Sequence, residues 1–441
     1  MAMYCVLENN VVVDLDNLHN FIPLSALRNC DEYFETVDLI SKHVSYRLID
    51  KELFANSLFM KSRFVELLVS VVHFRNMGTL KSIHNVTVNQ DVIVELNLNH
   101  YVVNYEIGSL ITVRRSTLLI QFLANRLFYF LGILSVKETS TSVRRIMRLW
   151  VETAAYNLSE NHEKYAITEC YIYPFGNKIG RVISLIGKLS KKGYKFRLTG
   201  YRYSIVNLLK LLISFNDELY LRYIQGACVK HMNEFADVEL VLTSSEWSIQ
   251  DVVTFRDAKF KFINVNHGMG FFSPYCSYTK IIHINEVQRK YYALRNSLDF
   301  ELNSSFTYLP TNTNNVQLAS SKLVLIDQGD LKSKLRGYED GLYKKLCSIL
   351  SEHDGEVFVK FHPNSTVEHK KYILECYGFS ELQSFEKDKY TFFSLFSTAY
   401  YDFGYRGSFV FIKDDLFSPT SLFGDLIDVR HINELKNILK V

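Results

Sequence analysis

The sequence predicts an α/β protein built from two Rossmann-like domains that face each other across a cleft. From about residue 165 onward, strand-like apolar runs alternate with helical stretches, which is the pattern of βαβ units in parallel sheets. A polar segment at 301–321, which contains Pro310 and lacks apolar periodicity, divides this region into two series. The length of 441 residues leaves room for two or three compact units.

Composition narrows the class of protein further. Hydrophobic residues make up 48% of the chain and charged residues 22%, which suits ordinary folded cores and not a disordered chain. Fifty basic residues against 47 acidic ones leave a net charge of +3, so we expect no nucleic-acid partner. Seven scattered cysteines without a Cys-x-x-Cys pair indicate neither a zinc site nor a disulfide framework. Together with a start that does not resemble a secretory signal, they favour a cytoplasmic location.

The first 160 residues carry few readable signals. A helical run at 62–74 and a strand-like patch at 88–98 are the elements expected there. Asp14 and Asp16 form the chain's one Asp-x-Asp motif, which could hold manganese in principle. Its distance in sequence from the candidate phosphate residues argues against that use, so we expect no metal site.

An apolar run at 118–136 has the length of a membrane span but carries Asn125 and Arg126 near its middle. A central arginine is costly in lipid, which favours a core helix over a spanning one. The following segment VRRIMRLW, with Arg144, Arg145 and Arg148, fits either a solvated helix face or contact with anionic headgroups. Peripheral contact with the inner face of the cytoplasmic membrane therefore stays open.

The first βαβ series predicts a Rossmann-like core at about 165–300 within an N-terminal, acceptor-side domain of residues 1–315. Its expected order is strand, helix, strand, then two further strands, at 167–173, 178–193, 195–201, 239–243 and 260–266. The second series predicts a nucleotide-sugar-binding domain of residues 316–441. Its expected elements are strands at 322–327, 356–361, 391–396 and 407–412, a helix ending near 351, and a terminal helix from about 431.

Lys360, His362 and Pro363 end one strand of the second series. The strand period of two places Lys360 and His362 on one face and Val359 with Phe361 on the other, and Pro363 stops the strand. Both basic side chains would then project at a carboxyl end, where open α/β sheets bind ligands. An ammonium and an imidazole can clamp a phosphate, although a surface lysine beside a strand-ending His-Pro is an alternative.

Ser397 and Thr398 lie between a strand-like run and a short helical run, where they resemble an N-cap. Hydroxyls and free backbone N–H groups at a helix N-terminus can hold an anion, while simple capping is the alternative. We expect this segment at the same sheet edge as His362.

In the first series, His267 and Gly268 follow a strand. The glycine permits close backbone approach, and the imidazole could act as a general base or be merely structural.

The ordered set NHG at 266–268, KFHP at 360–363 and FST at 396–398 resembles bacterial GT-B glycosyltransferases that use cytidine nucleotides. This group includes capsule and lipopolysaccharide sialyltransferases, Kdo transferases, and the CDP-glycerol glycerophosphotransferases of teichoic acid synthesis. The resemblance covers roughly residues 165–430 and implies the GT-B fold. Neither GxGxxG nor GxxxxGK[ST] is present, which weakens dinucleotide-binding and P-loop interpretations.

The resemblance implies that His362, Ser397 and Thr398 hold the phosphate and cytidine of a CMP-sugar, with Lys360 assisting and Pro363 and Gly268 belonging to the same motifs. His267 matches a proposed catalytic base. The implied activity is a metal-independent, cofactor-free transfer of a sialic-acid-like or Kdo-like sugar from its CMP donor to a glycan or glycolipid acceptor. Such an enzyme would serve polysaccharide biosynthesis for a bacterial capsule or lipopolysaccharide.

One departure leaves the base open. The sialyltransferases carry an acid-acid-Gly motif in the first domain, whereas here the only such triplet, at 339–341, precedes the His-Pro strand and fits a solvated helix face. His267 is therefore the default base. Two alternative functions remain: a CDP-glycerol-type phosphotransferase, and a non-catalytic glycan-binding subunit of the same fold.

Overall fold

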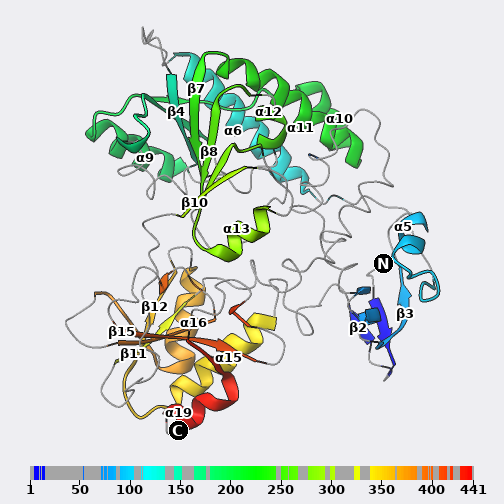
Figure 1. The fold of residues 1–441 in the computed structure, drawn as a ribbon, viewed down its shortest axis with the longest axis vertical. Helices are drawn as coiled ribbons and strands as arrows, with labels where there is room; N and C mark the ends of the chain where they lie inside the picture. Colours follow the sequence, from blue (N-terminus) through cyan, green and yellow to red (C-terminus); the bar gives the residue numbers. More distant parts are fainter. Residues whose placement is uncertain are drawn as a thin grey trace.

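The computed structural model contains two parallel β-sheets with their helices and one small antiparallel sheet (Figure 1). The structure describes residues 4–8, 10, 12–14, 53, 71–72, 74–76, 78–85, 90–103, 111, 113–134, 144–150, 163–174, 179–244, 250–256, 258–266, 277–293, 298–302, 322–327, 338–362, 365–384, 390–395, 397, 399–400, 407–414, 418–420 and 428–439.

Seven strands form the first parallel sheet, in the order β10-β9-β8-β7-β4-β5-β6. The chain builds outward from β4 to β6 and then returns to the other side of β4 with β7 to β10, which is a doubly wound arrangement. The strands are β4 (Arg144–Trp150), β5 (Glu169–Tyr173), β6 (Phe196–Leu198), β7 (Val238–Thr243), β8 (Lys261–Val265), β9 (Lys280–His283) and β10 (Asp299–Leu302).

Six strands form the second parallel sheet, in the order β13-β12-β11-β14-β15-β16. Numbered from β11, this order is 3-2-1-4-5-6, that of the dinucleotide-binding doubly wound fold. The strands are β11 (Lys322–Ile326), β12 (Val357–Lys360), β13 (Ser380–Glu381), β14 (Tyr390–Ser394), β15 (Gly407–Lys413) and β16 (Asp428–His431). The predicted α/β class with two parallel-sheet domains is thus confirmed.

Helices connect the strands where the sequence predicts them. The helix expected at 178–193 is α9, and the chain ends in a short 3₁₀ turn and α19, as expected from about residue 431. Among the described residues of the two parallel-sheet domains, the helices are α6 (Arg115–Leu134), α9 (Ile179–Lys191), α10 (Ile205–Ile213), α11 (Asp217–Met232), α12 (Asp251–Phe255), α13 (Glu286–Ala293), α15 (Tyr338–Ser351), α16 (Val367–Tyr377) and α19 (Leu435–Leu439).

The strand predicted at 88–98 is wrong, because the structure has a helix, α5 (Gln90–Glu95), in its place. Asn97 ends this helix in the left-handed conformation, with φ 53°. The Leu98 N–H donates to the Ile93 carbonyl at 2.9 Å, and both side chains are buried. This is the Schellman pattern, in which asparagine replaces the usual glycine. Beside α5 lies the antiparallel sheet of β1 (Tyr4–Leu7), β2 (Val12–Asp14) and β3 (Leu80–His84) (Figure 1).

The segment VRRIMRLW is a strand and not the expected solvated helix face or headgroup contact. It forms β4, next to β7 and β5, so the sheet begins before residue 165. Three ion pairs satisfy its arginines: Arg144 with Glu169 at 3.2 Å, Arg145 with Glu239 at 3.0 Å and Arg148 with Asp251 at 2.8 Å. Of the three arginines only Arg148 is fully buried, and a buried charge requires a partner. The three acidic partners lie far along the chain.

The apolar run at 118–136 forms α6, which covers the edge strand β6. A Cβ atom added to Gly132 would lie 2.1 Å from the Leu198 carbonyl oxygen, so a glycine is needed for this approach. Leu118, Phe122 and Phe128 are buried on the inner face. By length and composition, α6 is the one helix among the described residues that could cross a membrane, and much of its outer face is exposed. The core-helix prediction therefore holds for one face of α6.

The second sheet buries both of its faces. On one face, residues of β11, β12, β14 and β15 form a cluster with α15, α16 and α19. The other face contributes Val324, Ile326 and Phe392 to the larger buried cluster that also contains residues of the first sheet. Strands buried on both sides explain the nearly continuous apolar runs that made them readable in the sequence.

Candidate functional site

Three of the residues predicted to hold a nucleotide, Lys360, His362 and Ser397, lie at the carboxyl edge of the second sheet. Strand β11 pairs in parallel with β12 on one side and β14 on the other, so β12 and β14 are two strand spacings apart, about 10 Å. The chain order reverses between β11 and β14, and ligands of doubly wound sheets bind outside the strand ends at such a point. Lys360 and His362 lie at the end of β12, and Ser397 lies just past the end of β14.

Lys360 and His362 have the alternation expected from the sequence. Val359 and Phe361 are buried against the helices, whereas Lys360 and His362 are only partly buried. No hydrogen bond or ion pair joins Lys360 Nζ to another of the residues that the structure describes. An ammonium in this situation can accept an anionic ligand without first breaking an internal ion pair.

Asp327 follows β11 directly and organises the edge. The Asp327 N–H donates to the Lys360 carbonyl at 3.0 Å, which extends the pairing of β11 with β12 by one residue. Its Oδ1 accepts from the Tyr343 hydroxyl at 2.8 Å and from His369 Nε2 at 2.9 Å. The other oxygen, Oδ2, accepts from the Ser365 hydroxyl at 2.5 Å, and the His362 N–H lies 3.5 Å away. Asp327 thus joins β11, α15, α16 and the segment after β12.

Hydrogen bonds keep Asp327 ionised inside the protein. Its side chain is 0% exposed, and this burial by itself would raise the carboxyl pKa. The hydrogen bonds from His369, Ser365 and Tyr343, with the charge of His369, outweigh burial and lower the pKa of Asp327 below its usual value. Because both oxygens are engaged within the protein, Asp327 positions other groups and is not placed to touch a ligand.

Helix α16 begins at the same edge. Thr366 is its N-cap, with Oγ1 accepting from the His369 N–H at 3.1 Å, and the Ser365 N–H donates to the His362 carbonyl at 2.9 Å. These bonds hold Ser365 and the first turn of α16 next to His362. The helix runs for eleven residues, so its N-terminus adds a positive dipole end beside Lys360 and His362.

Ser397 caps the helical turn that follows β14, as the sequence predicts. Its Oγ accepts from the Ala399 N–H at 3.1 Å, and the Tyr400 N–H donates to the Ser397 carbonyl at 3.2 Å. Tyr400 is buried against Phe409 and Phe411, which fixes the turn on the sheet. The Ser397 hydroxyl uses an oxygen lone pair for the cap and keeps its hydrogen for donation to a ligand.

Four of the predicted site residues, namely His267, Gly268, Pro363 and Thr398, lie outside the described residues. The chain entering His267 is nevertheless firmly placed. Asn266 Nδ2 donates to Gln288 Oε1 at 3.0 Å, Asn264 Nδ2 donates to Asn266 Oδ1 at 2.6 Å, and all three side chains are buried. The same Gln288 oxygen accepts from the Ile284 N–H at 3.0 Å. This amide network holds the carboxyl ends of β8 and β9 in register with α13.

A second polar cluster lies inside the first sheet's domain, where Arg148, Tyr201 and Asp251 meet. Arg148 is 0% exposed; its guanidinium lies 2.8 Å from Asp251 and 4.5 Å from the centre of the Tyr173 ring. The Tyr201 hydroxyl lies 3.3 Å from both Arg148 Nη2 and Asp251 Oδ1. The charge of Asp251 outweighs burial and raises the already high pKa of Arg148. The pair ties β4 to α12.

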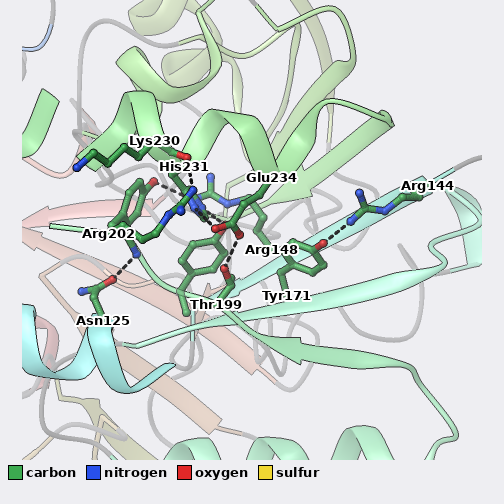
Figure 2. Close-up of polar contacts among 11 residues, drawn as sticks. Asn125, Arg144, Arg148, Tyr171, Thr199, Arg202, Lys230, His231 and Glu234 are labelled. Carbon is green, nitrogen blue, oxygen red and sulfur yellow. Dashed lines mark hydrogen bonds and ion pairs between the residues drawn. The ribbon is translucent and has the colours of Figure 1, made fainter. Parts of the chain in front are cut away.

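His231 and Glu234 extend this cluster, and Figure 2 shows them between Thr199 and Arg148. The Tyr173 hydroxyl and His231 Nε2 are 2.8 Å apart, and Thr199 donates to Glu234 at 3.1 Å. Complete burial lowers the pKa of His231, so its imidazole is neutral at neutral pH. With its charges matched and buried, this cluster has the character of a structural core.

Sequence reasoning missed Asp327, Ser365, His369 and the Asn264–Gln288 network. One signal could have revealed Asp327, since a lone acidic residue ends the apolar run KLVLI just as the basic pair ends EVFVKF. His369 and Ser365 gave no such signal, because their meeting with Asp327 depends on the tertiary placement of α16. Among the described residues, no group of three or more His, Cys, Asp or Glu side chains is arranged to hold a metal ion.

Comparisons with known proteins leave the family open. No protein-family model matches the chain. No curated protein matches its sequence either.

Proposed function

We propose that the protein is a GT-B glycosyltransferase that moves a sialic-acid-like or Kdo-like sugar from a CMP donor to a glycan acceptor in bacterial surface polysaccharide synthesis. One observation carries the proposal. Lys360, His362 and Ser397, chosen from the sequence as phosphate and nucleotide contacts, lie at the carboxyl ends of the two strands that flank β11. The order of the six strands puts them at the usual ligand edge.

The chemistry needed is stabilisation of a departing nucleoside monophosphate. As the bond from the sugar's anomeric carbon to the phosphate oxygen breaks, the electron pair goes to that oxygen and negative charge grows on CMP. The N-terminus of α16 is a fixed donor for this charge and needs no rearrangement during the reaction, and Lys360 and His362 add donors beside it. Asp327 contributes indirectly, since its bonds to Ser365 and His369 anchor the start of α16 beside His362.

The acceptor hydroxyl needs a base, and His267 is the candidate. The bonds among Asn264, Asn266 and Gln288 fix the backbone immediately before it. A residue carried at the end of such a braced strand can be presented to a substrate with little loss of entropy. His267 would take the hydroxyl proton as the acceptor oxygen attacks the sugar.

Calorimetric titration with CMP, followed by donor hydrolysis assays, tests the proposal. We expect the original chain to bind CMP. The double variant Lys360→Ala with His362→Ala should bind CMP more weakly. Lys371→Ala is the matched control, because this α16 lysine is exposed and lies 3.8 Å from Glu375. We also expect His267→Ala to retain CMP binding but to lose product. Preference for CDP-glycerol over CMP would indicate the phosphotransferase, and unchanged polysaccharide complementation by His267→Ala and His362→Ala would indicate a non-catalytic subunit.

A further inference from the structure

Helices α6 and α10 expose large apolar side chains along their outer faces. On α6 the exposed arc contains Leu123, Leu127 and Phe130 at 56%, 51% and 60% exposure, with four further apolar side chains and only Arg115, Ser116 and Arg126 as polar members. On α10 it contains Leu209 at 54% and Ile213 at 80%. We call this the helical apolar surface; its members are Leu119, Ile120, Leu123, Leu127, Phe130, Leu131, Ile133, Ile205, Val206, Leu209 and Ile213.

The two helices are fixed neighbours, so their outer faces belong to one rigid part of the fold. They contact each other directly. Arg126 of α6 donates to the Tyr203 carbonyl, just before α10, at 2.8 Å, and the Tyr201 N–H donates to Asn125 Oδ1 at 2.9 Å. Ser204 caps α10, while Leu208 and Leu211 anchor its inner face in the core. The outward residues are therefore surplus to the core that these helices complete.

The sequence ranges that form α6, α9 and α10 are rich in basic residues. Residues 107–137, which contain α6, and 170–216, which contain α9 and α10, hold 13 lysines and arginines and no aspartate or glutamate. The whole chain has almost equal numbers of both, 50 and 47. Arg115, Arg126 and Lys210 are exposed on α6 and α10 themselves. Large apolar side chains, with exposed basic residues and no acidic residue on α6 and α10 themselves, match the boundary between lipid tails and anionic headgroups.

We propose that the helical apolar surface docks onto an anionic lipid bilayer, with α6 and α10 lying in its interface. A spanning α6 does not fit the contacts, because Leu118, Phe122 and Phe128 are buried in the domain and Gly132 lies against β6. An interfacial helix buries its apolar side chains about 5–10 Å deep while basic side chains reach the headgroups. This inference is independent of the proposed transferase activity.

Flotation of the full chain with lipid vesicles tests this docking. The probe vesicles contain phosphatidylcholine with about 30 mol% phosphatidylglycerol, and pure phosphatidylcholine vesicles serve for comparison. The test variant is Leu123→Gln with Leu209→Gln. The matched control is Val94→Gln with Leu302→Gln, whose side chains are similarly exposed, at 50% and 54%, but lie on α5 and on β10 at the opposite edge of the first sheet.

We expect the chain to float with the anionic vesicles, to bind pure phosphatidylcholine at least tenfold more weakly, and to be released by about 0.5 M salt. The test variant should bind anionic vesicles at least tenfold more weakly, whereas the control should bind as the original chain does. Thermal unfolding checks both folds; if the double variant does not fold, Leu209→Gln against Leu302→Gln makes the same comparison.

Failure of the original chain to float with anionic vesicles would overturn the proposal, as would equal loss in test and control variants or equal binding to both vesicle types. Sedimentation identifies the competing occupant. A dimer that the test variant converts to monomer, without vesicle binding by the original chain, would assign the surface to a second copy of this chain.

Discussion

The two parallel sheets share a doubly wound order but differ in how far their charged side chains are buried. In the first sheet, Arg148 turns inward and is neutralised by Asp251 in a fully buried pair. In the second sheet, Lys360 and His362 stay partly exposed, and the buried Asp327 binds the polypeptide around them. With the same topology, one set of polar side chains is buried and holds the fold, and the other stays partly exposed at the sheet edge.

This difference separates stability from binding in a way that substitution can test. A buried, matched ion pair is costly to break because the remaining charge has no solvent. Removing a partly exposed basic side chain changes the free energy of unfolding little, but it weakens the binding of an anionic ligand. Variants in the Arg148–Asp251 cluster should change the free energy of unfolding. Variants at the carboxyl edge of the second sheet should change nucleotide binding.

Arg148→Met should have the largest effect, because it leaves Asp251 charged and buried without its partner. We expect a loss of about 3–5 kcal/mol in the free energy of unfolding, measured by urea denaturation. CMP affinity of the folded fraction should not change. Arg148→Met combined with Asp251→Leu should be less destabilised than Arg148→Met alone, since the double variant leaves no orphaned charge. Equal free energies of unfolding for the original chain and Arg148→Met would contradict a structural role of the pair.

Lys360→Ala with His362→Ala should show the opposite behaviour. Each lost charge-assisted hydrogen bond is worth about 1.5–3 kcal/mol, so CMP affinity should fall by at least about tenfold in calorimetry. Urea denaturation should give a free energy of unfolding within about 0.5 kcal/mol of the original. Unchanged CMP affinity would show that this edge is not the nucleotide site.

Asp327→Asn should affect both properties, because Asp327 links the fold to the edge. The amide cannot accept from Tyr343, His369 and Ser365 as the carboxylate does, so we expect about 1.5–3 kcal/mol less stability. CMP affinity should fall as well, since Ser365 and His369, which lie beside His362, lose their anchor. A change in stability with unchanged affinity would limit Asp327 to a structural role.

His231 should make the stability of the Arg148–Asp251 cluster, which it extends, sensitive to mild acid. Burial lowers its pKa from the ordinary 6.5, so below that pH the unfolded chain takes up a proton that the folded chain resists. The free energy of unfolding should therefore fall as pH drops below about 6.5, and His231→Gln should lose part of this dependence. Urea titrations at about pH 7.5 and 5.5 measure it; the same slope in the variant would rule out His231 as its source.

Ser397→Ala should give the smallest effect. It removes a neutral capping bond to the Ala399 N–H and one hydroxyl donor, together worth about 0.5–1.5 kcal/mol. CMP affinity should fall by roughly threefold to tenfold, measured by calorimetry. Ser397→Thr keeps the hydroxyl and is the control; equal affinity for both variants and the original would leave Ser397 a cap alone.

Strands buried on both faces could be predicted from the sequence, because their apolar runs are local signals. The edge that carries Lys360, His362 and Ser397 followed from their positions relative to those runs. Strand β4 could not be recognised, because three arginines hide its pattern and their acidic partners lie on other elements. Asp327 could not be recognised for a related reason. Its positioning role depends on His369 and Ser365, and only the packing of α16 brings these two residues to it.

A crystal structure of the chain with CMP is the most direct test of the central claim. The account predicts the phosphate between Lys360, His362 and the first turn of α16, with the Ser397 hydroxyl at the nucleotide. CMP bound at the carboxyl edge of the seven-stranded sheet, away from these three side chains, would contradict it.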